Sequence, residues 1–251
     1  MSVTSVCVFY ISQLFENARC AIRIILSLTV YVAIYCYVAG LIAWVTFNHV
    51  YLERSLSIPR LLTFIVLADS TVNTALGVLR LKSTCMIYGV LSCPISPPEF
   101  VLAYVGSATT RTLLISAIAL LVCNSAFGLE VAHPTDLCVW LLLISCTFTM
   151  IGFCLGIWLA SRLSIHVLAA AVIPVWVVFS GGSLPLEQQP PWFRLIESID
   201  PVSRVIHWLQ WVLYGSSPED MVSIVLTILT ILTLGLVSTA IGFRRGALFN
   251  I

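Results

Sequence analysis

VSIVLTILTILTLGLVSTAIGF, residues Val222–Phe243, contains no charged residue and is followed directly by Arg244-Arg245. A helix rises about 1.5 Å per residue, so about 20 apolar residues cross the ~30 Å hydrocarbon layer of a bilayer. This stretch is therefore long enough and apolar enough to be a transmembrane helix.

Similar stretches recur along the chain and predict an all-α integral membrane protein with six transmembrane helices in one domain, residues 1–251. The other five are Ile24–Phe47, Leu61–Leu79, Val101–Phe127, Leu137–Ala160 and Ile165–Phe179. The last of these is short, and it reaches the length of a span only if residues 180–184 are included. The composition agrees, because 60% of the residues are hydrophobic and 9% are charged, whereas a soluble domain has roughly 25% charged residues.

Basic residues near the ends of the spans predict the orientation, because Lys and Arg are enriched in cytoplasmic loops. If the N-terminus is inside, seven basic residues lie on the inner side and four on the outer side. The inner residues are Arg19, Arg23, Arg80, Lys82, Arg162, Arg244 and Arg245, and the outer ones are Arg54, Arg60, Arg194 and Arg204. We therefore predict that both termini are cytoplasmic.

In residues 1–23, apolar side chains recur every three or four positions, at Phe9, Leu14, Phe15, Ala18 and Ile22. This spacing predicts an amphipathic helix that lies in the membrane interface and leads into the first span. The alternative is a plain extension of that span into water.

Residues 80–100, on the predicted inner side, remain rather apolar and end in Pro94-Ile95-Ser96-Pro97-Pro98-Glu99. Ser96 suits an N-cap, Pro97 the first helical position, and Glu99 completes a capping box. We predict that a helix begins at Pro97 in the cytoplasm and continues into the third span. Arg111 would then extend its side chain towards the inner interface. The apolar patch favours a protein partner, although a helix resting on the lipid surface explains it equally well.

Residues 181–220, on the predicted outer side, combine Gly181-Gly182 with two amphipathic stretches. Asp200-Pro201 provides an N-cap and a first-turn proline for the second stretch. Its apolar residues are Val202, Val205, Ile206, Leu209, Val212 and Leu213, and its Trp208 and Trp211 are typical of the headgroup level. The region predicts a re-entrant element, with helices that dip into the outer leaflet without crossing it.

Asp69 is the one acidic residue near the middle of a predicted span, and Asn73 follows one helical turn later. Placing an ionisable residue inside the membrane costs free energy, so such a residue is by default a candidate functional residue. These two residues either line a polar pathway or connect one helix to another. Gly152-x-x-x-Gly156 predicts close packing of its helix against a neighbour.

The sequence contains no motif for self-contained chemistry. Its only lysine, Lys82, follows Leu81, so the Gly-Lys-Ser/Thr triplet of a P-loop is missing. The His-Glu-x-x-His and Gly-x-Ser-x-Gly motifs are also missing, and the four His residues are scattered. We therefore expect no catalytic and no metal site in this chain. The net charge of +1 argues against a nucleic-acid partner.

Two motifs resemble those of the ABC exporter permeases of the second type, which include permeases for nodulation factors, polysaccharides and drugs. The first is Leu91-Ser92-Cys93-Pro94-Ile95-Ser96-Pro97-Pro98-Glu99, followed by Arg111. The second, more specific match comprises Phe179-Ser180-Gly181-Gly182-Ser183-Leu184-Pro185-Leu186, Pro190-Pro191-Trp192 and Ile199-Asp200-Pro201-Val202-Ser203. The resemblance covers nearly the whole chain.

The resemblance implies a permease subunit in the bacterial plasma membrane, surrounded by membrane lipid and paired with a second permease subunit, either a copy or a relative. Two cytoplasmic P-loop ATPase subunits would bind ATP and Mg, so this chain would hold no cofactor. The residues expected to contact the ATPase are Lys82, Met86, Tyr88, Leu91, Pro94, Ser96 and Glu99. Gly181, Gly182, Pro185 and Pro201 would belong to the outer re-entrant element.

In such a permease, spans 1, 2 and 5 would line the substrate path, with Asp69, Asn73 and Arg111 as polar residues within the membrane. Two other classes of function stay open. One is a membrane-embedded enzyme acting on lipid, for which only Asp69 and Asn73 offer polar groups at one depth. The other is a membrane assembly factor that transports nothing. A P-loop ATPase that purifies with the chain would distinguish the permease from both.

Overall fold

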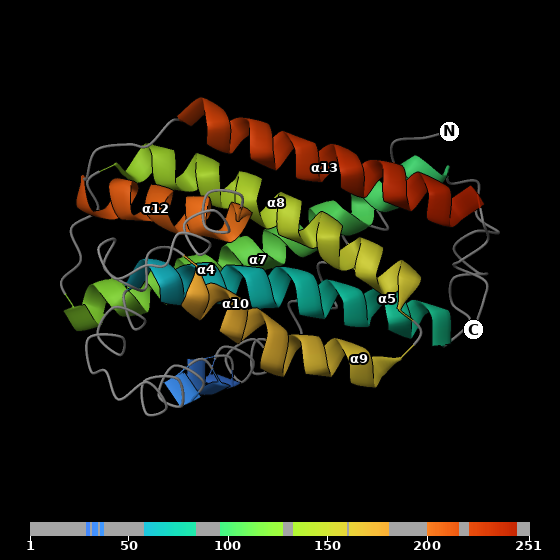
Figure 1. Cartoon of the computed structure of the whole chain (residues 1–251), viewed down its shortest axis with the longest axis horizontal. Helices are drawn as coiled ribbons and strands as arrows, with labels where there is room; N and C mark the ends of the chain where they lie inside the picture. Colours follow the sequence, from blue (N-terminus) through green and yellow to red (C-terminus); the bar gives the residue numbers. More distant parts are fainter. Residues whose placement is uncertain are drawn as a thin grey trace, which may run out of the picture.

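The computed structural model describes residues 29–30, 32–34, 36–37, 58–83, 96–127, 133–159, 161–180, 200–215 and 221–244. Every regular element within these residues is a helix (Figure 1). In chain order the longer elements are α4 Ile58–Ala68, η1 Asp69–Asn73, α5 Thr74–Ser83, α7 Pro97–Phe127, α8 Pro134–Trp158, α9 Arg162–Val167, η2 Leu168–Val172, α10 Ile173–Phe179, α12 Pro201–Tyr214 and α13 Met221–Arg244. The elements η1 and η2 are single π-helical turns.

Four helices in the described residues are long enough and apolar enough to cross a membrane: Ile58–Ser83, Pro98–Ser125, Pro134–Trp158 and Val225–Gly242. They correspond to the predicted second, third, fourth and sixth spans. The fifth predicted span appears as α9, η2 and α10 and is not among the four. The first predicted span lies almost wholly outside the described residues, and residues 1–23 lie entirely outside them. The count of six spans stays a prediction.

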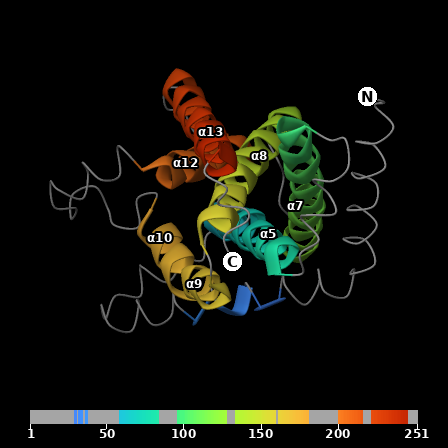
Figure 2. The same ribbon diagram turned by 90° about the vertical axis from the view of Figure 1, so that its right-hand side faces the viewer.

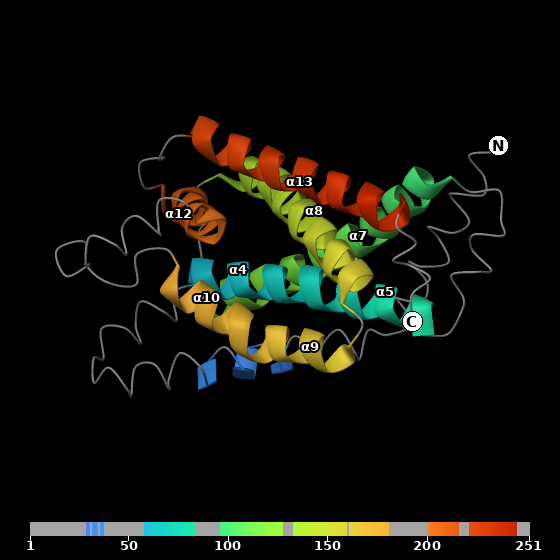
Figure 3. The ribbon, with the colours of Figure 1, turned by 45° about the vertical axis from the view of Figure 1, so that its right-hand side comes forward.

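The helices run along the long axis of the molecule, and the segments 58–83, 97–127, 134–158, 162–179 and 221–244 alternate in direction (Figure 3). The last residues of α5, α8 and α13 lie at one end, together with the first residues of α7 and α9. Because the helices α5, α9 and α13 carry basic residues there, we call this the basic end; these residues are Arg80, Lys82, Arg162 and Arg244. The alternation agrees with the predicted order of spans.

Helix α8 lies between α13 on one side and α5 on the other, with α7 alongside (Figure 2). The predicted close packing at Gly152 and Gly156 is confirmed. A Cβ atom added at Gly156 would lie 2.9 Å from the carbonyl oxygen of Ala75 and 2.6 Å from the Cβ of Val78. Only a glycine allows the backbones of α8 and α5 to approach this closely.

The helix Ile58–Ser83, made of α4, η1 and α5, is the most buried of the four spanning helices. In its most apolar window, 78% of the residues are buried within the subunit, against 22% for α13. Its many Ser and Thr side chains return hydrogen bonds to their own backbone, as when Thr63 Oγ1 donates to the carbonyl oxygen of Pro59 at 2.8 Å. This pairing lets hydroxyl groups sit in an apolar surrounding. Because so much of this helix is buried, little of its surface is open to a substrate. Its predicted role in lining the substrate path stays a prediction.

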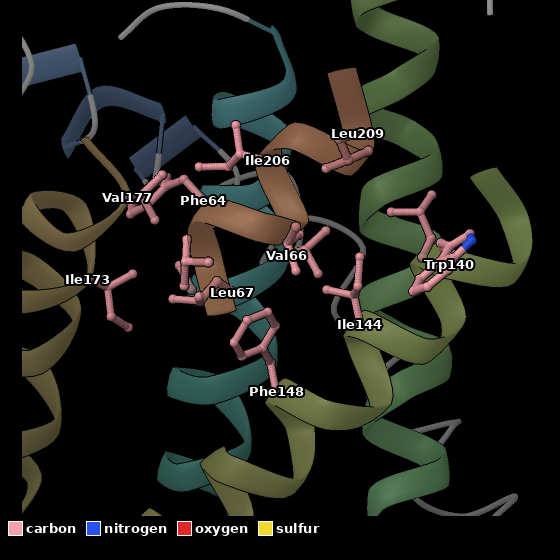
Figure 4. Packing of buried hydrophobic residues seen from close by; sticks show 14 of the residues in the cluster. Phe64, Val66, Leu67, Trp140, Ile144, Phe148, Ile173, Val177, Ile206 and Leu209 are labelled. Carbon is pink, nitrogen blue, oxygen red and sulfur yellow. The ribbon is translucent and has the colours of Figure 1, made fainter. Parts of the chain in front are cut away.

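At the end opposite the basic end, α4, α8, α10 and α12 share one apolar core. Figure 4 shows this core from close by. Its larger side chains are Phe64 and Leu67 of α4, Trp140 and Phe148 of α8, Ile173 and Val177 of α10, and Ile206 and Leu209 of α12. The core joins segments far apart in the sequence into one packed unit.

The predicted amphipathic helix after Asp200 is confirmed as α12. The six apolar residues expected on its inner face, from Val202 to Leu213, are all buried. Gly215 ends the helix with a φ of 70°, a left-handed conformation that glycine adopts without strain. With 14 residues, α12 is too short to cross a bilayer; its depth in the outer leaflet stays a prediction.

Trp208, predicted to lie at the headgroup level, is covered by other parts of the subunit, and its depth in the bilayer stays a prediction. Its side chain is buried, and its ring packs on that of Trp140 with the ring centres 4.5 Å apart. Burying two large aromatic rings against each other gains more contact than leaving them apart. Trp211, which is half-buried, stacks on His133 instead.

Candidate functional site

Asp69 is fully buried, and its carboxylate has partners on two helices. On its own helix, Asn73 Nδ2 donates to Asp69 Oδ1. From α7, Thr112 Oγ1 donates to Asp69 Oδ2 at 3.0 Å, and Arg111 Nε lies 3.4 Å from the same oxygen. Arg111 Nη2 also donates to the backbone carbonyl oxygen of Asp69, at 3.4 Å. Through Arg111 and Thr112, Asp69 connects the helix Ile58–Ser83 to α7.

The contacts in this cluster reduce the free-energy cost of placing two charged side chains inside the membrane. An isolated carboxylate or guanidinium in the bilayer is costly, and each costs about 2.5–3.5 kcal/mol at the centre of a helix. Placing the two charges side by side, with two further donors on the carboxylate, offsets much of that cost. Of the two roles predicted for Asp69 and Asn73, the structure shows the connection between helices for Asp69, whereas Asn73 donates to Asp69 within the same helix. Their role in a polar pathway stays a prediction.

The expected extension of Arg111 towards the inner interface is wrong. Its side chain turns to Asp69 and is only 14% exposed. The physical reason is that a buried carboxylate one helix away attracts the guanidinium more strongly than the interface does, because Coulomb attraction grows where water is excluded. Hydropathy along one helix could not reveal a partner on another.

The π-turn η1 starts at Asp69 and lies directly against α8. A Cβ atom added at Gly152 would lie 2.5 Å from the carbonyl oxygen of Thr71 and 2.8 Å from that of Ser70. The backbone of α8 therefore touches the backbone of the π-turn with no side chain between them. Single π-turns inside α-helices are rare and are often found at functional sites.

Lys82, predicted to contact an ATPase, is engaged within the subunit. Its Nζ donates to the carbonyl oxygen of Ile157, and the side chain is buried. The last carbonyl groups of a helix lack partners along the helix, and a positive charge there is favourable. Lys82 thus caps α8 at the basic end. Its contact with an ATPase stays a prediction.

The predicted start of the third span is confirmed. Glu99 Oε2 accepts a hydrogen bond from the backbone N–H of Ser96 at 2.9 Å, and the N–H of Phe100 donates to the carbonyl oxygen of Ser96 at 3.1 Å. This is the carboxylate half of a capping box, and α7 begins at Pro97 as expected. The other predicted contact residues, Met86, Tyr88, Leu91 and Pro94, lie outside the described residues.

Asp200 connects the end of α10 to the start of α12. Its carboxylate accepts from Trp176 Nε1 at 2.9 Å, from Ser180 Oγ, and from the backbone N–H of Val202 at 3.1 Å. Pro201 occupies the first turn of α12, as predicted. Gly181, Gly182 and Pro185 of the predicted re-entrant element lie outside the described residues.

Sequence reasoning missed three of these partners: Thr112, Trp176 and the pairing of Ser180 with Asp200. Ser180 and Asp200 both belong to the second motif, and each is a polar residue at the end of an apolar segment. That pattern could have indicated their pairing from the sequence. Thr112 and Trp176 left no comparable signal, because threonine and tryptophan are common in membrane helices for other reasons.

The described helices define a polytopic helical membrane protein whose buried charges connect its helices. Among the residues that the structure describes, no three His, Cys, Asp or Glu side chains gather where they could hold a metal ion. The sequence profile of the family named ABC-2 type transporter matches residues 9–214. The chain therefore belongs to this family and is an ABC transporter permease. A comparison with curated proteins found no match.

Proposed function

We propose that this permease is the transmembrane subunit of an ATP-driven exporter, works as a dimer, and is coupled to separate cytoplasmic ATPase subunits. The observation that carries the proposal is the family match over residues 9–214. The sequence supports a separate ATPase because its single lysine is not part of a P-loop. Substrate would pass between the two permease subunits. Hydrolysis of ATP by the ATPase subunits would move the transmembrane helices, with residues 80–100 transmitting the movement.

The proposal includes the bacterial plasma membrane as location, with both termini in the cytoplasm. Its support is the gathering of Arg80, Lys82, Arg162 and Arg244 at the basic end. Positive charge near the ends of spans is typical of the cytoplasmic side. The ATPase subunits would then bind at the basic end.

The test is purification of the full chain from its native host, followed by identification of associated proteins and measurement of vanadate-sensitive ATP hydrolysis. We expect a P-loop ATPase in the complex. If none is present, the proposed function fails.

A double variant, Tyr88→Glu with Leu91→Glu, tests the location of the contact. We expect the recovered ATPase to fall about tenfold or more, because loss of an interface hot spot costs about 2 kcal/mol or more. Tyr214→Glu is the matched control, since Tyr214 is 58% exposed at the end opposite the basic end. Equal recovery from the double variant and the control would contradict the proposed contact.

A further inference from the structure

In the sequence, residues 84–95 stand between two described helices that both contact the last turns of α8. Helix α5 ends at Ser83, directly before this segment, and α7 begins at Pro97, soon after it. The end of α5, the start of α7 and the end of α8 lie together at the basic end (Figure 3). The segment contains most of the residues that we expect to contact an ATPase, from Met86 to Pro94. The contacts at its two ends therefore bear on how it meets a partner.

The first end is held by Lys82, whose side chain reaches from α5 to α8. Its Nζ donates to the carbonyl oxygen of Ile157 in the last turn of α8, and the residue is only 5% exposed. One turn earlier in α5, Val78 packs directly on Gly156. A hydrogen bond from a charged, buried donor is stronger than one between neutral groups. Ser83, the last residue of α5, is thus attached to α8 through its neighbour.

The second end is held by aromatic rings. Phe100, in the first turn of α7, is buried, and its ring centre lies 6.2 Å from that of Phe153 of α8. Tyr104, one turn later, packs on the same ring with the centres 5.5 Å apart. Tilted aromatic pairs at this spacing gain free energy beyond that of burial alone. Glu99 also accepts from the backbone N–H of Ser96, so the direction in which the chain enters α7 is fixed.

Ile157 takes part in both attachments. Its carbonyl oxygen binds Lys82, while its side chain is 1% exposed and belongs to the same buried cluster as Phe100 and Phe153. Helix α8 is itself held in place, because it lies between α5 and α13 (Figure 2). The helix before residues 84–95 and the helix after them therefore rest on one fixed support.

Fixing both ends of a segment on one support reduces the number of conformations open to it. A partner that binds an already ordered surface loses less conformational entropy, so it binds more tightly. The attachments on α8 would give residues 84–95 this advantage.

We propose that Lys82, Phe100 and Phe153 are positioning residues, which fix residues 84–95 to the end of α8 in the arrangement that the ATPase binds. Lys82 acts through the carbonyl group of Ile157 and does not itself touch the ATPase. The identity of the partner rests on the proposed function, whereas the attachment to α8 does not.

The first arm of the test measures how firmly the two ends are held relative to each other. Spin labels at Ser83 and Leu102, both exposed, report the distance from the end of α5 to the start of α7 by electron-electron double resonance. The full chain is placed in lipid nanodiscs. Because it has nine cysteines, the labels are attached through a non-natural amino acid.

We expect one narrow distance distribution in the wild type. Lys82→Met removes the donor but keeps an apolar side chain of similar length, so the end of α5 should fray and the distribution broaden by at least about half. Lys82→Arg, which keeps a cationic donor, should retain the wild-type width. Phe153→Leu, which removes the ring but keeps a large apolar side chain, should broaden the distribution as well.

Ser238→Ala is the matched control. Ser238 accepts from Trp158 Nε1 at 3.1 Å, so it attaches α8 to α13 at the same end but lies on neither α5 nor α7. The control should keep the wild-type width. An unchanged width in Lys82→Met would overturn the proposal. Equal broadening in Lys82→Met and in the control would also overturn it, since the effect would then be a general loosening of the basic end.

The second arm measures how much ATPase purifies with each variant from the native host. Lys82→Met should recover about fivefold less ATPase than the wild type, because the partner must then order the segment as it binds. Lys82→Arg and Ser238→Ala should both recover as much as the wild type.

The two arms together separate positioning from direct contact and from the proposed function. Reduced recovery with an unchanged width would mean that Lys82 contacts the ATPase directly, which would overturn the proposal. A broadened distribution with full recovery would overturn the positioning role and leave the proposed function intact. A wild type that purifies without an ATPase would contradict the proposed function and the partner named here, while the widths would still decide the attachment to α8.

Discussion

At the scale of the residue, Asp69 and Arg111 show how a membrane helix can carry charge. Either charged side chain alone would be costly to place in the bilayer. The two lie on neighbouring helices, close enough to form an ion pair. Thr112 and Asn73 provide the carboxylate with two further donors. A buried ion pair of this kind more often determines which groups pack together than adds strongly to stability. The reason is that the cost of removing both charges from water cancels much of their mutual attraction.

The pair can be tested by a double-mutant cycle. Arg111→Leu leaves the Asp69 carboxylate buried without its counter-charge, so we expect a loss of about 3–5 kcal/mol in stability. Combining it with Asp69→Asn removes both charges and should recover more than half of that loss. The measurement is the chemical unfolding midpoint in detergent micelles. Additive losses in the double variant would show that the two side chains do not interact.

At the scale of the element, the two glycines of α8 decide how closely it approaches the second span. Gly152 faces backbone atoms of the π-turn, whereas Gly235 of α13 faces the side chain of Met150. The added Cβ would meet a heavy atom at 2.5 Å in the first case and 2.8 Å in the second. The difference lies in what can move: a methionine side chain rotates away, and a helix backbone does not.

We therefore expect Gly152→Ala to destabilise the protein by about 1–3 kcal/mol, as overpacking does in a filled interior. Gly235→Ala, the matched control, should cost less than about 1 kcal/mol because Met150 can rearrange. The thermal unfolding midpoints of the two purified variants, measured in the same detergent, show which substitution is the more destabilising. A larger effect at Gly235 would mean that α8 does not rest on η1 as described.

At the scale of the whole molecule, the alternating helices place the basic residues of α5, α9 and α13 at one end. That arrangement predicts the outcome of fusion reporters. Alkaline phosphatase joined after residue 131 should be active, because that loop would be outside the cytoplasm. Green fluorescent protein joined after residue 251 should fluoresce, because the C-terminus would be inside. The reverse pattern in both fusions would refute the predicted orientation.

Much of the architecture could be predicted from local patterns. Four spans, the start of α7 at Pro97 and the cap of α12 at Asp200 all depend on residues close together in the sequence, where hydropathy and capping rules apply. The candidate site was only half predictable. Asp69 and Asn73 stand out by being polar in an apolar run, whereas their partners on α7 are set by packing between helices.

The sequence by itself determined that this chain crosses a membrane, where most of its helices begin and end, and that it lacks a P-loop, because each depends on the chemistry of a short stretch. Only the tertiary structure decided what the buried polar groups do. Arg111 pairs with Asp69 and does not reach the interface, Lys82 caps α8, and Trp208 packs on Trp140. The physical reason is the same in each case. A polar or aromatic side chain in an apolar surrounding takes its partner from another helix, and only the packing of the helices brings that partner within reach.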